Sequence, residues 1–139
     1  MTGGLVEFLS PEWARQMVEL AERARAELGR FSGQAVGYDA AALHLLDEWI
    51  ERSPSPPQTV RLLWVAFLGE VFRRRHGGEW VIHRDDGQRL AVLCPQESGG
   101  VHRVEVAVQV SNRLTNGLAD SLALFYARES ILLKRPKEL

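Results

Sequence analysis

The chain has 139 residues, of which 45% are hydrophobic and 25% are charged, a globular composition that excludes an intrinsically disordered protein. Seventeen Lys and Arg residues nearly balance eighteen Asp and Glu residues, and the net charge of -1 excludes a polybasic or polyacidic chain. No apolar run approaches the roughly 20 residues that cross a bilayer, so we expect no membrane partner. We expect one domain over residues 1–139, with flexible ends at 1–9 and 134–139.

The first predicted helix begins at Ser10 and Pro11. A serine side chain accepts a hydrogen bond from a free N–H of the first turn, and proline is favoured at the first helical position. From Trp13 to Leu28, apolar residues recur at spacings of three and four, which predicts one buried face. We expect Gly29 to end this helix.

A second helix is predicted over residues 40–52, with Asp39 as its cap. Its apolar face is expected to consist of Leu43, Leu46, Trp49 and Ile50. The polar residues expected to point away from that face are His44, Asp47, Glu48 and Glu51. The proline-rich segment 53–57 then breaks the helix, because proline lacks the N–H donor and restricts the residue before it.

The third predicted helix covers residues 60–76, with Thr59 as its cap. It is apolar on all sides before Arg73. A helix without a polar face is normally buried, so we expect this one at the centre of the fold. Gly77 and Gly78 are expected to end it.

The pattern changes to strands after the two glycines. Residues 79–83 and 90–94 are short β-prone runs on either side of the turn residues Asp85, Asp86 and Gly87, which predicts a hairpin. Alternating valines over residues 104–110 predict a third strand with one buried face. Residues 114–118 are expected to form a helical turn or loop.

A last helix is predicted after Asp120, which is expected to cap it. Its packing side is expected to consist of Leu122, Phe125, Tyr126 and Leu132. The predicted fold class is therefore α+β, with two N-terminal amphipathic helices, a central buried helix, a three-stranded antiparallel meander and a C-terminal helix.

Glu70 is the most informative residue for function, because it lies in the most apolar segment of the third helix. A carboxylate in such a place must be paired, neutralised or exposed to a cleft. We favour an ion pair with Arg73 or Arg74, which follow at helical spacing, or with Arg113 through a tertiary contact. The alternative is a general base or ligand-binding carboxylate with a raised pKa.

Arg73, Arg74 and Arg75 form a basic cluster at the end of the third helix. Cations in a last helical turn complement the negative end of the helix dipole. The chain as a whole is not basic, and no nucleic-acid-binding motif is present. We therefore favour a structural role for the cluster over a nucleic-acid contact.

No complete ligand set for a metal ion or a cofactor is visible, and we expect neither. His83 and His102 lack further ligands at a metal-binding spacing, and no phosphate-binding or dinucleotide motif is present. We also name no catalytic residue. Cys94 is expected to be a buried thiol, and because a single cysteine forms no internal disulfide, we expect a cytoplasmic protein.

The segment Phe67-Leu68-Gly69-Glu70-Val71 is followed by three arginines, by Gly77-Gly78 and by Trp80. This order resembles a group of small bacterial domains of unknown function, in which a buried Leu-Gly-Glu-Val helix precedes Gly-Gly-x-Trp. The resemblance covers the second half of the chain. The segments similar to the end of those domains are Arg113-Leu114, Asn116-Gly117 and Asp120-Ser121-Leu122. The resemblance implies a stand-alone bacterial domain, and some similar domains accompany secretion or toxin systems.

Three functions are compatible with these patterns. The leading hypothesis is a non-catalytic bacterial protein-interaction domain of accessory or immunity type, which binds another protein or a second copy of itself. The alternative is a small-molecule-binding domain or hydrolase with a cleft around Glu70. The third is nucleic-acid binding through Arg73, Arg74 and Arg75. Whether the chain is an enzyme stays open, and a non-enzymatic role is favoured.

Overall fold

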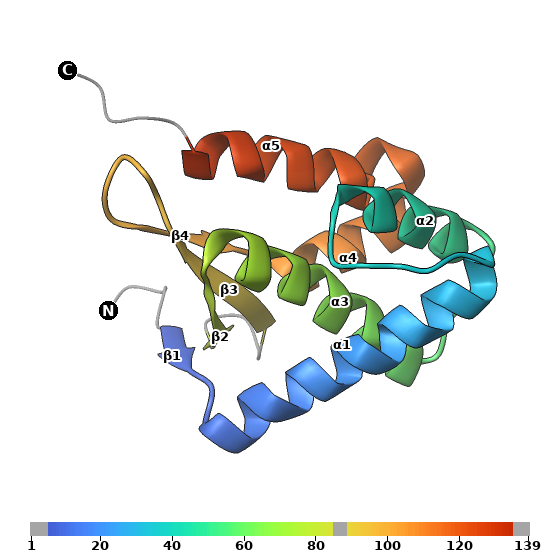
Figure 1. Ribbon diagram of the computed structural model, residues 1–139, viewed down its shortest axis with the longest axis horizontal. Helices are drawn as coiled ribbons and strands as arrows, with labels where there is room; N and C mark the ends of the chain where they lie inside the picture. The colour runs from blue at the N-terminus through green and yellow to red at the C-terminus, as the bar shows by residue number, and fades with distance from the viewer. Residues whose placement is uncertain (1–5, 85–88, 135–139) are drawn as a thin grey trace.

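The computed structural model describes residues 6–84 and 89–134, and these residues form an α+β protein (Figure 1). Its helices are α1 (Pro11–Ser32), α2 (Ala40–Glu51), α3 (Gln58–His76), α4 (Val106–Asn116), a short 3-10 helix (Gly117–Asp120) and α5 (Leu122–Lys134). Its strands are β1 (Val6–Phe8), β2 (Glu79–His83), β3 (Arg89–Pro95) and β4 (Val101–Val104). They form one antiparallel sheet in the order β1-β2-β3-β4. The predicted α+β class is confirmed, whereas the number of strands and the helix layout differ.

Helix α3 lies at the centre of the molecule, as its sequence predicts. All ten residues from Leu63 to Phe72 are buried. Figure 1 shows α1 and α5 on opposite sides of α3, and the sheet packs beside its C-terminal half. The helix ends at Gly77, which adopts the left-handed φ of 72° that glycine tolerates best. No helix in the described ranges is both long enough and apolar enough to cross a membrane.

The first two helices begin where the sequence predicts. Ser10 Oγ accepts a hydrogen bond from the Trp13 N–H at 3.1 Å, and Asp39 Oδ1 accepts one from the Ala42 N–H at 2.9 Å. The predicted end of α1 at Gly29 is wrong, because the helix continues for another turn. It ends at Gly33, whose φ is 71° and whose N–H donates to the carbonyl of Gly29.

The predicted hairpin is present, with β2 paired to β3 so that Trp80 lies opposite Val92. Its predicted turn at residues 85–87 falls outside the described residues. Residues 6–9, which were expected to lie within an end of the chain at 1–9, are part of the fold. Val6–Phe8 pair with β2 as an additional edge strand, and Leu9 is buried in the core. At the other end of the chain, Lys134 is the last residue of α5.

The predicted strand over residues 104–110 is wrong, because the chain turns into helix α4 at Val106. Only Val104 of the alternating valines belongs to a strand, at the end of β4. Val106, Val110 and Arg113 follow one another at helical spacing, and all three are buried. This helical face overrides the strand preference of β-branched residues once it packs against α3 and β3.

Two of the expected helix caps also differ. Thr59 does not cap α3, which begins after Pro57 and has no side-chain hydrogen bond at its start. Asp120 does not cap α5; instead Ser121 Oγ accepts a hydrogen bond from the Leu124 N–H. Of the helical turn or loop expected at 114–118, the structure shows the helical alternative, since these residues are the last turn of α4 and the beginning of the 3-10 helix.

Candidate functional site

The carboxylate of Glu70 is enclosed by donors and has no exposed surface. Arg73 donates to it through Nε at 2.7 Å and through Nη2 at 2.9 Å. Arg74 donates through Nε at 2.9 Å, and the indole Nε1 of Trp80 donates at 2.8 Å. The structure therefore brings Glu70 together with the two arginines that follow it at helical spacing, but not with Arg113.

These four hydrogen bonds determine the charge state of Glu70. Burial alone raises the pKa of a carboxyl group, but the hydrogen bonds from Arg73, Arg74 and Trp80 outweigh burial and hold the pKa of Glu70 below its ordinary value. Glu70 is thus an ionised acceptor with its oxygens occupied. A general base needs a raised pKa and access to a substrate proton, and Glu70 has neither.

Gly69 lets the indole of Trp80 reach this carboxylate. A Cβ atom at position 69 would lie 2.0 Å from the Cη2 atom of Trp80, closer than any packed contact allows. Glycine at this point of α3 therefore makes room for the ring, and the ring nitrogen then completes the acceptor capacity of Glu70. The Leu-Gly-Glu-Val segment and Trp80 act as one packing unit between α3 and β2.

The ion-pair network continues from Arg74 to helix α1. The Arg74 guanidinium lies 4.0 Å from the ring centroid of Tyr38, a cation–π contact. The Tyr38 hydroxyl donates a hydrogen bond to Glu22, which also accepts one from Arg25 Nη2 at 2.9 Å. The hydrogen bonds from Arg25 and Tyr38 lower the pKa of Glu22 to about 2.

None of the three arginines at the end of α3 is left without a contact. Arg73 and Arg74 bind Glu70, and Arg75 Nε donates to the backbone carbonyl of Tyr38 at 2.7 Å. A phosphate would have to compete with these contacts. The cluster joins α3 to α1 and to the segment before α2, which accounts for its charge without a nucleic acid.

Arg113 forms a second buried ion pair, with Asp47 instead of Glu70. Its Nε donates to Asp47 Oδ1 at 2.9 Å, and its Nη2 donates to Glu51 Oε1 at 2.9 Å. The Asp47 carboxylate also accepts hydrogen bonds from the backbone N–H groups of Leu122 and Ala123, at 3.0 and 3.1 Å. Asp47 on α2 thus holds α4 through Arg113 and caps the first turn of α5.

Asp47 was expected to point away from the apolar face of its helix, and its buried ion pair was not predicted. Asp47 is only 6% exposed. The signal was its spacing, because Asp47 lies four residues after Leu43 and three before Ile50, both of which are buried. A carboxylate on an apolar stripe needs a buried cation, and Arg113 supplies it.

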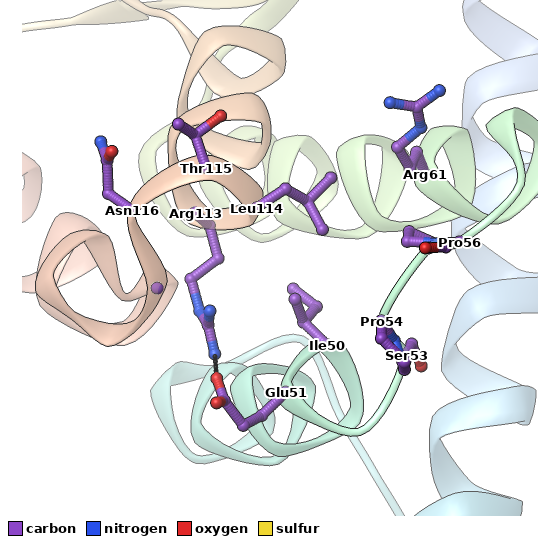
Figure 2. Close-up of a pocket in the computed structure, with 12 residues that line it drawn as sticks. Ile50, Glu51, Ser53, Pro54, Pro56, Arg61, Arg113, Leu114, Thr115 and Asn116 are labelled. Atoms are coloured by element: carbon purple, nitrogen blue, oxygen red, sulfur yellow. Dashed lines mark hydrogen bonds and ion pairs between the residues drawn. The ribbon is translucent and has the colours of Figure 1, made fainter.

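A polar cavity of about 740 Å³ lies between the end of α2, the proline-rich segment and the end of α4 (Figure 2). Figure 2 shows Ile50 and Leu114 pointing into it, and Arg113 reaching down to Glu51 at its edge. Arg61 points away from this ion pair. The carboxylate of Glu51 is therefore already paired with Arg113, and the side chain of Arg61 does not point toward it.

A second, mostly apolar groove of about 330 Å³ runs between α3 and α4, and we call it the α3–α4 groove. The residues of α3 that line it are Gln58, Arg61, Leu62 and Val65. The residues of α4 that line it are Ala107, Val110, Ser111 and Leu114, and Leu90 of β3 adds a further apolar side chain. Arg61 and Leu114 also line the polar cavity, so the two depressions adjoin.

No cluster of three or more His, Cys, Asp or Glu side chains is placed to hold a metal ion within residues 6–84 and 89–134. His102 Nε2 lies 2.7 Å from Glu129 of α5, and His83 Nδ1 lies 3.5 Å from Glu105. Cys94 is buried, as expected, and burial raises the pKa of its thiol to about 12. A thiol in this state is protonated at neutral pH and is a poor nucleophile.

Comparison with known proteins adds no assignment to this geometry. No family model matches the chain, and neither a curated protein nor a solved structure matches it.

Proposed function

We propose that this chain is a non-catalytic protein-interaction domain that binds a partner in the α3–α4 groove. The observation that supports the proposal is the pair of helix faces that line the groove. Residues 58, 61, 62 and 65 of α3 and residues 107, 110, 111 and 114 of α4 follow the same i, i+3, i+4, i+7 spacing. Each face spans eight residues, or about 10 Å of helix. Two such faces side by side offer a short partner segment an apolar floor and polar edges.

The two other functions considered have less support. A cleft around Glu70 would need an accessible carboxylate, but this one is fully buried and accepts four hydrogen bonds. Nucleic-acid binding through Arg73, Arg74 and Arg75 has less support because Glu70 offsets the charge of Arg73 and Arg74, and Arg75 donates to the carbonyl of Tyr38. The α3–α4 groove, by contrast, is a surface feature that the contacts among the described residues do not account for.

The test compares two exposed leucines on different helices. Leu62 lines the groove, and Leu124 lies on the outer face of α5, away from it. The parent, Leu62→Lys and Leu124→Lys would each be used as bait in extracts of the cells that make the protein, and the captured proteins would be identified by mass spectrometry. We expect a protein that the parent and Leu124→Lys retain and Leu62→Lys loses. It should rebind the purified parent in equimolar amount. Identical captured sets for all three baits would contradict the proposal.

A further inference from the structure

We infer that the partner segment in the α3–α4 groove is acidic as well as apolar, a short stretch of another protein that combines apolar side chains with Asp or Glu. This inference rests on the proposed function and specifies its partner. The apolar part follows from the groove floor, where Leu62, Val65, Val110 and Leu114 meet. The acidic part follows from the charge at the groove's edge.

Among the described residues, Arg61 is the one charged residue that lines the groove, and it also lines the adjoining polar cavity. Its side chain is exposed and makes no hydrogen bond or ion pair with any described residue. Among the residues that the structure describes, no acidic side chain lines the groove itself. Glu51, in the adjoining cavity, is held by Arg113 at 2.9 Å. A carboxylate from a partner would therefore meet an unmatched cation here.

The start of α3 adds positive potential at the same place. Arg61 lies in the first turn of α3, where the helix dipole presents its positive end. That turn has no acidic residue and no side-chain cap, whereas Ser10 and Asp39 cap α1 and α2. A cation at a helix start is unfavourable for the helix alone, and a carboxylate bound to Arg61 would reverse the effect by complementing the positive end of the helix dipole.

A second copy of the chain fits this surface less well than an acidic partner. The exposed apolar residues of α5, Leu124 and Ile131, stand one helical turn on either side of Arg128, which is exposed. If α5 of another copy entered the groove, Arg128 would approach Arg61, and two like charges would repel each other.

The experiment uses a phage-displayed library of random peptides of about twelve residues, long enough to span the groove as helix or extended chain. The library is selected on the intact parent, on Leu62→Lys, on Arg61→Glu and on the control Leu124→Lys, each first shown by its thermal melt to be folded. The most enriched peptides are then synthesised, and their dissociation constants are measured by fluorescence anisotropy at low and high salt.

We expect the parent to enrich peptides that combine apolar residues with Asp or Glu. Leu62→Lys should weaken such a peptide by about tenfold or more, and Leu124→Lys should change its affinity by less than about twofold. Arg61→Glu should shift the enriched peptides toward Lys and Arg, and salt should weaken the parent's binding. Sedimentation of the parent should show a monomer.

Failure of the charge inference can be distinguished from failure of the proposed function. If peptides depend on Leu62 but show no acidic preference, or if Arg61→Glu leaves that preference unchanged, the charge inference is wrong and the groove remains a binding site. If no enriched peptide depends on Leu62, both this inference and the proposed function are wrong. A dimer that Leu62→Lys dissociates would mean that the occupant is a second copy of the chain.

Discussion

Glu70 has no exposed surface, and its carboxylate accepts hydrogen bonds from Arg73, Arg74 and Trp80. The two arginine side chains remain 35% and 38% exposed, so the cluster has a dry acceptor and partly hydrated donors. This asymmetry decides what each partner contributes. Loss of one arginine removes hydrogen-bond donors that water can replace. Loss of the carboxylate leaves the buried indole N–H of Trp80 without an acceptor and creates a void.

Substitution of this carboxylate should therefore be costly. We expect Glu70→Ala to lower the free energy of unfolding by about 3 kcal/mol, at the low end for a broken buried pair because the arginines can turn to water. Glu70→Gln should cost less, since the amide keeps the shape and one acceptor oxygen. Urea denaturation at neutral pH measures both. A melting temperature of Glu70→Ala within a degree or two of the parent would contradict a structural role for Glu70.

The free energy of unfolding at acidic pH should depend on Glu22. Hydrogen bonds from Arg25 and Tyr38 lower its pKa from an ordinary 4.5 to about 2. A carboxyl group whose pKa is lower in the folded state adds stability above its unfolded pKa and loses that contribution as the pH falls toward the folded pKa. The free energy of unfolding should thus decrease between pH 4.5 and pH 2, the range set by these two values.

Glu22→Gln should flatten this decrease, and Tyr38→Phe should flatten it only in part, because Arg25 still donates to Glu22. Chemical denaturation at several pH values measures the slope for each protein. Equal slopes for the parent and Glu22→Gln would show that Glu22 does not contribute to the acid dependence.

Between elements, the packing of α3 on β2 depends on the absence of a side chain at Gly69. In an exposed helix, Gly→Ala adds about 1 kcal/mol of stability. At Gly69 the sign should reverse, since the new Cβ would lie 2.0 Å from the Trp80 ring. We expect Gly69→Ala to destabilise the protein by about 1–3 kcal/mol, the usual cost of overpacking.

A double-mutant cycle separates this clash from the intrinsic effect of the substitution. In Trp80→Leu, which has room beside position 69, Gly69→Ala should cost much less than in the parent. Thermal and urea denaturation of the four proteins give the coupling energy. If the two substitutions changed the free energy of unfolding additively, Gly69 and Trp80 would not be energetically coupled.

The second junction, where α2, α4 and α5 meet, should depend on Asp47. Asp47→Ala would leave Arg113, which is 2% exposed, without its main partner and would remove the acceptor of the Leu122 and Ala123 N–H groups at the start of α5. We expect a loss of about 3–5 kcal/mol. Asp47→Asn, which keeps an acceptor at that position, should cost less. The matched control is Glu48→Ala on the exposed side of α2, which should have little effect on the urea midpoint. Equal midpoints for Asp47→Ala and Glu48→Ala would show that the junction does not depend on Asp47.

The elements that local chemistry determines were predictable. Ser10, Asp39 and the ten-residue buried segment of α3 each carry their signal within a few residues of sequence. The pairing of Glu70 with Arg73 and Arg74 is also local, since it follows from helical spacing.

What the sequence did not reveal depends on contacts between distant segments. Residues 104–110 fit a strand by alternation, and only packing of Val110 and Arg113 against other elements favours the helix. Arg113 finds Asp47 across 66 residues, a pairing that no local spacing encodes. The α3–α4 groove likewise requires α3 and α4 to lie side by side. It could not be predicted while residues 104–110 were interpreted as a strand, because α4 forms one of its two sides.

Across the whole molecule, the two ends of α3 differ in how they use arginine. At the C-terminal end, Arg73, Arg74 and Arg75 complement the helix dipole and bind internal partners. At the N-terminal end, Arg61 opposes the dipole and has no partner among the described residues. The proposed acidic partner would favour arginine at position 61, whereas the stability of the helix alone favours an acidic residue there.

This difference leads to a prediction that separates stability from binding at a single residue. Arg61→Glu places a carboxylate in the first turn of α3, where the dipole favours it, and should raise the free energy of unfolding by about 0.3–1 kcal/mol. Arg61→Gln should fall between the parent and Arg61→Glu. Urea denaturation at low salt measures all three, and high salt should reduce the differences because exposed charges are screened. If Arg61→Glu were instead clearly less stable than the parent, Arg61 would have a structural partner, and its positive charge would no longer indicate an acidic segment in the groove.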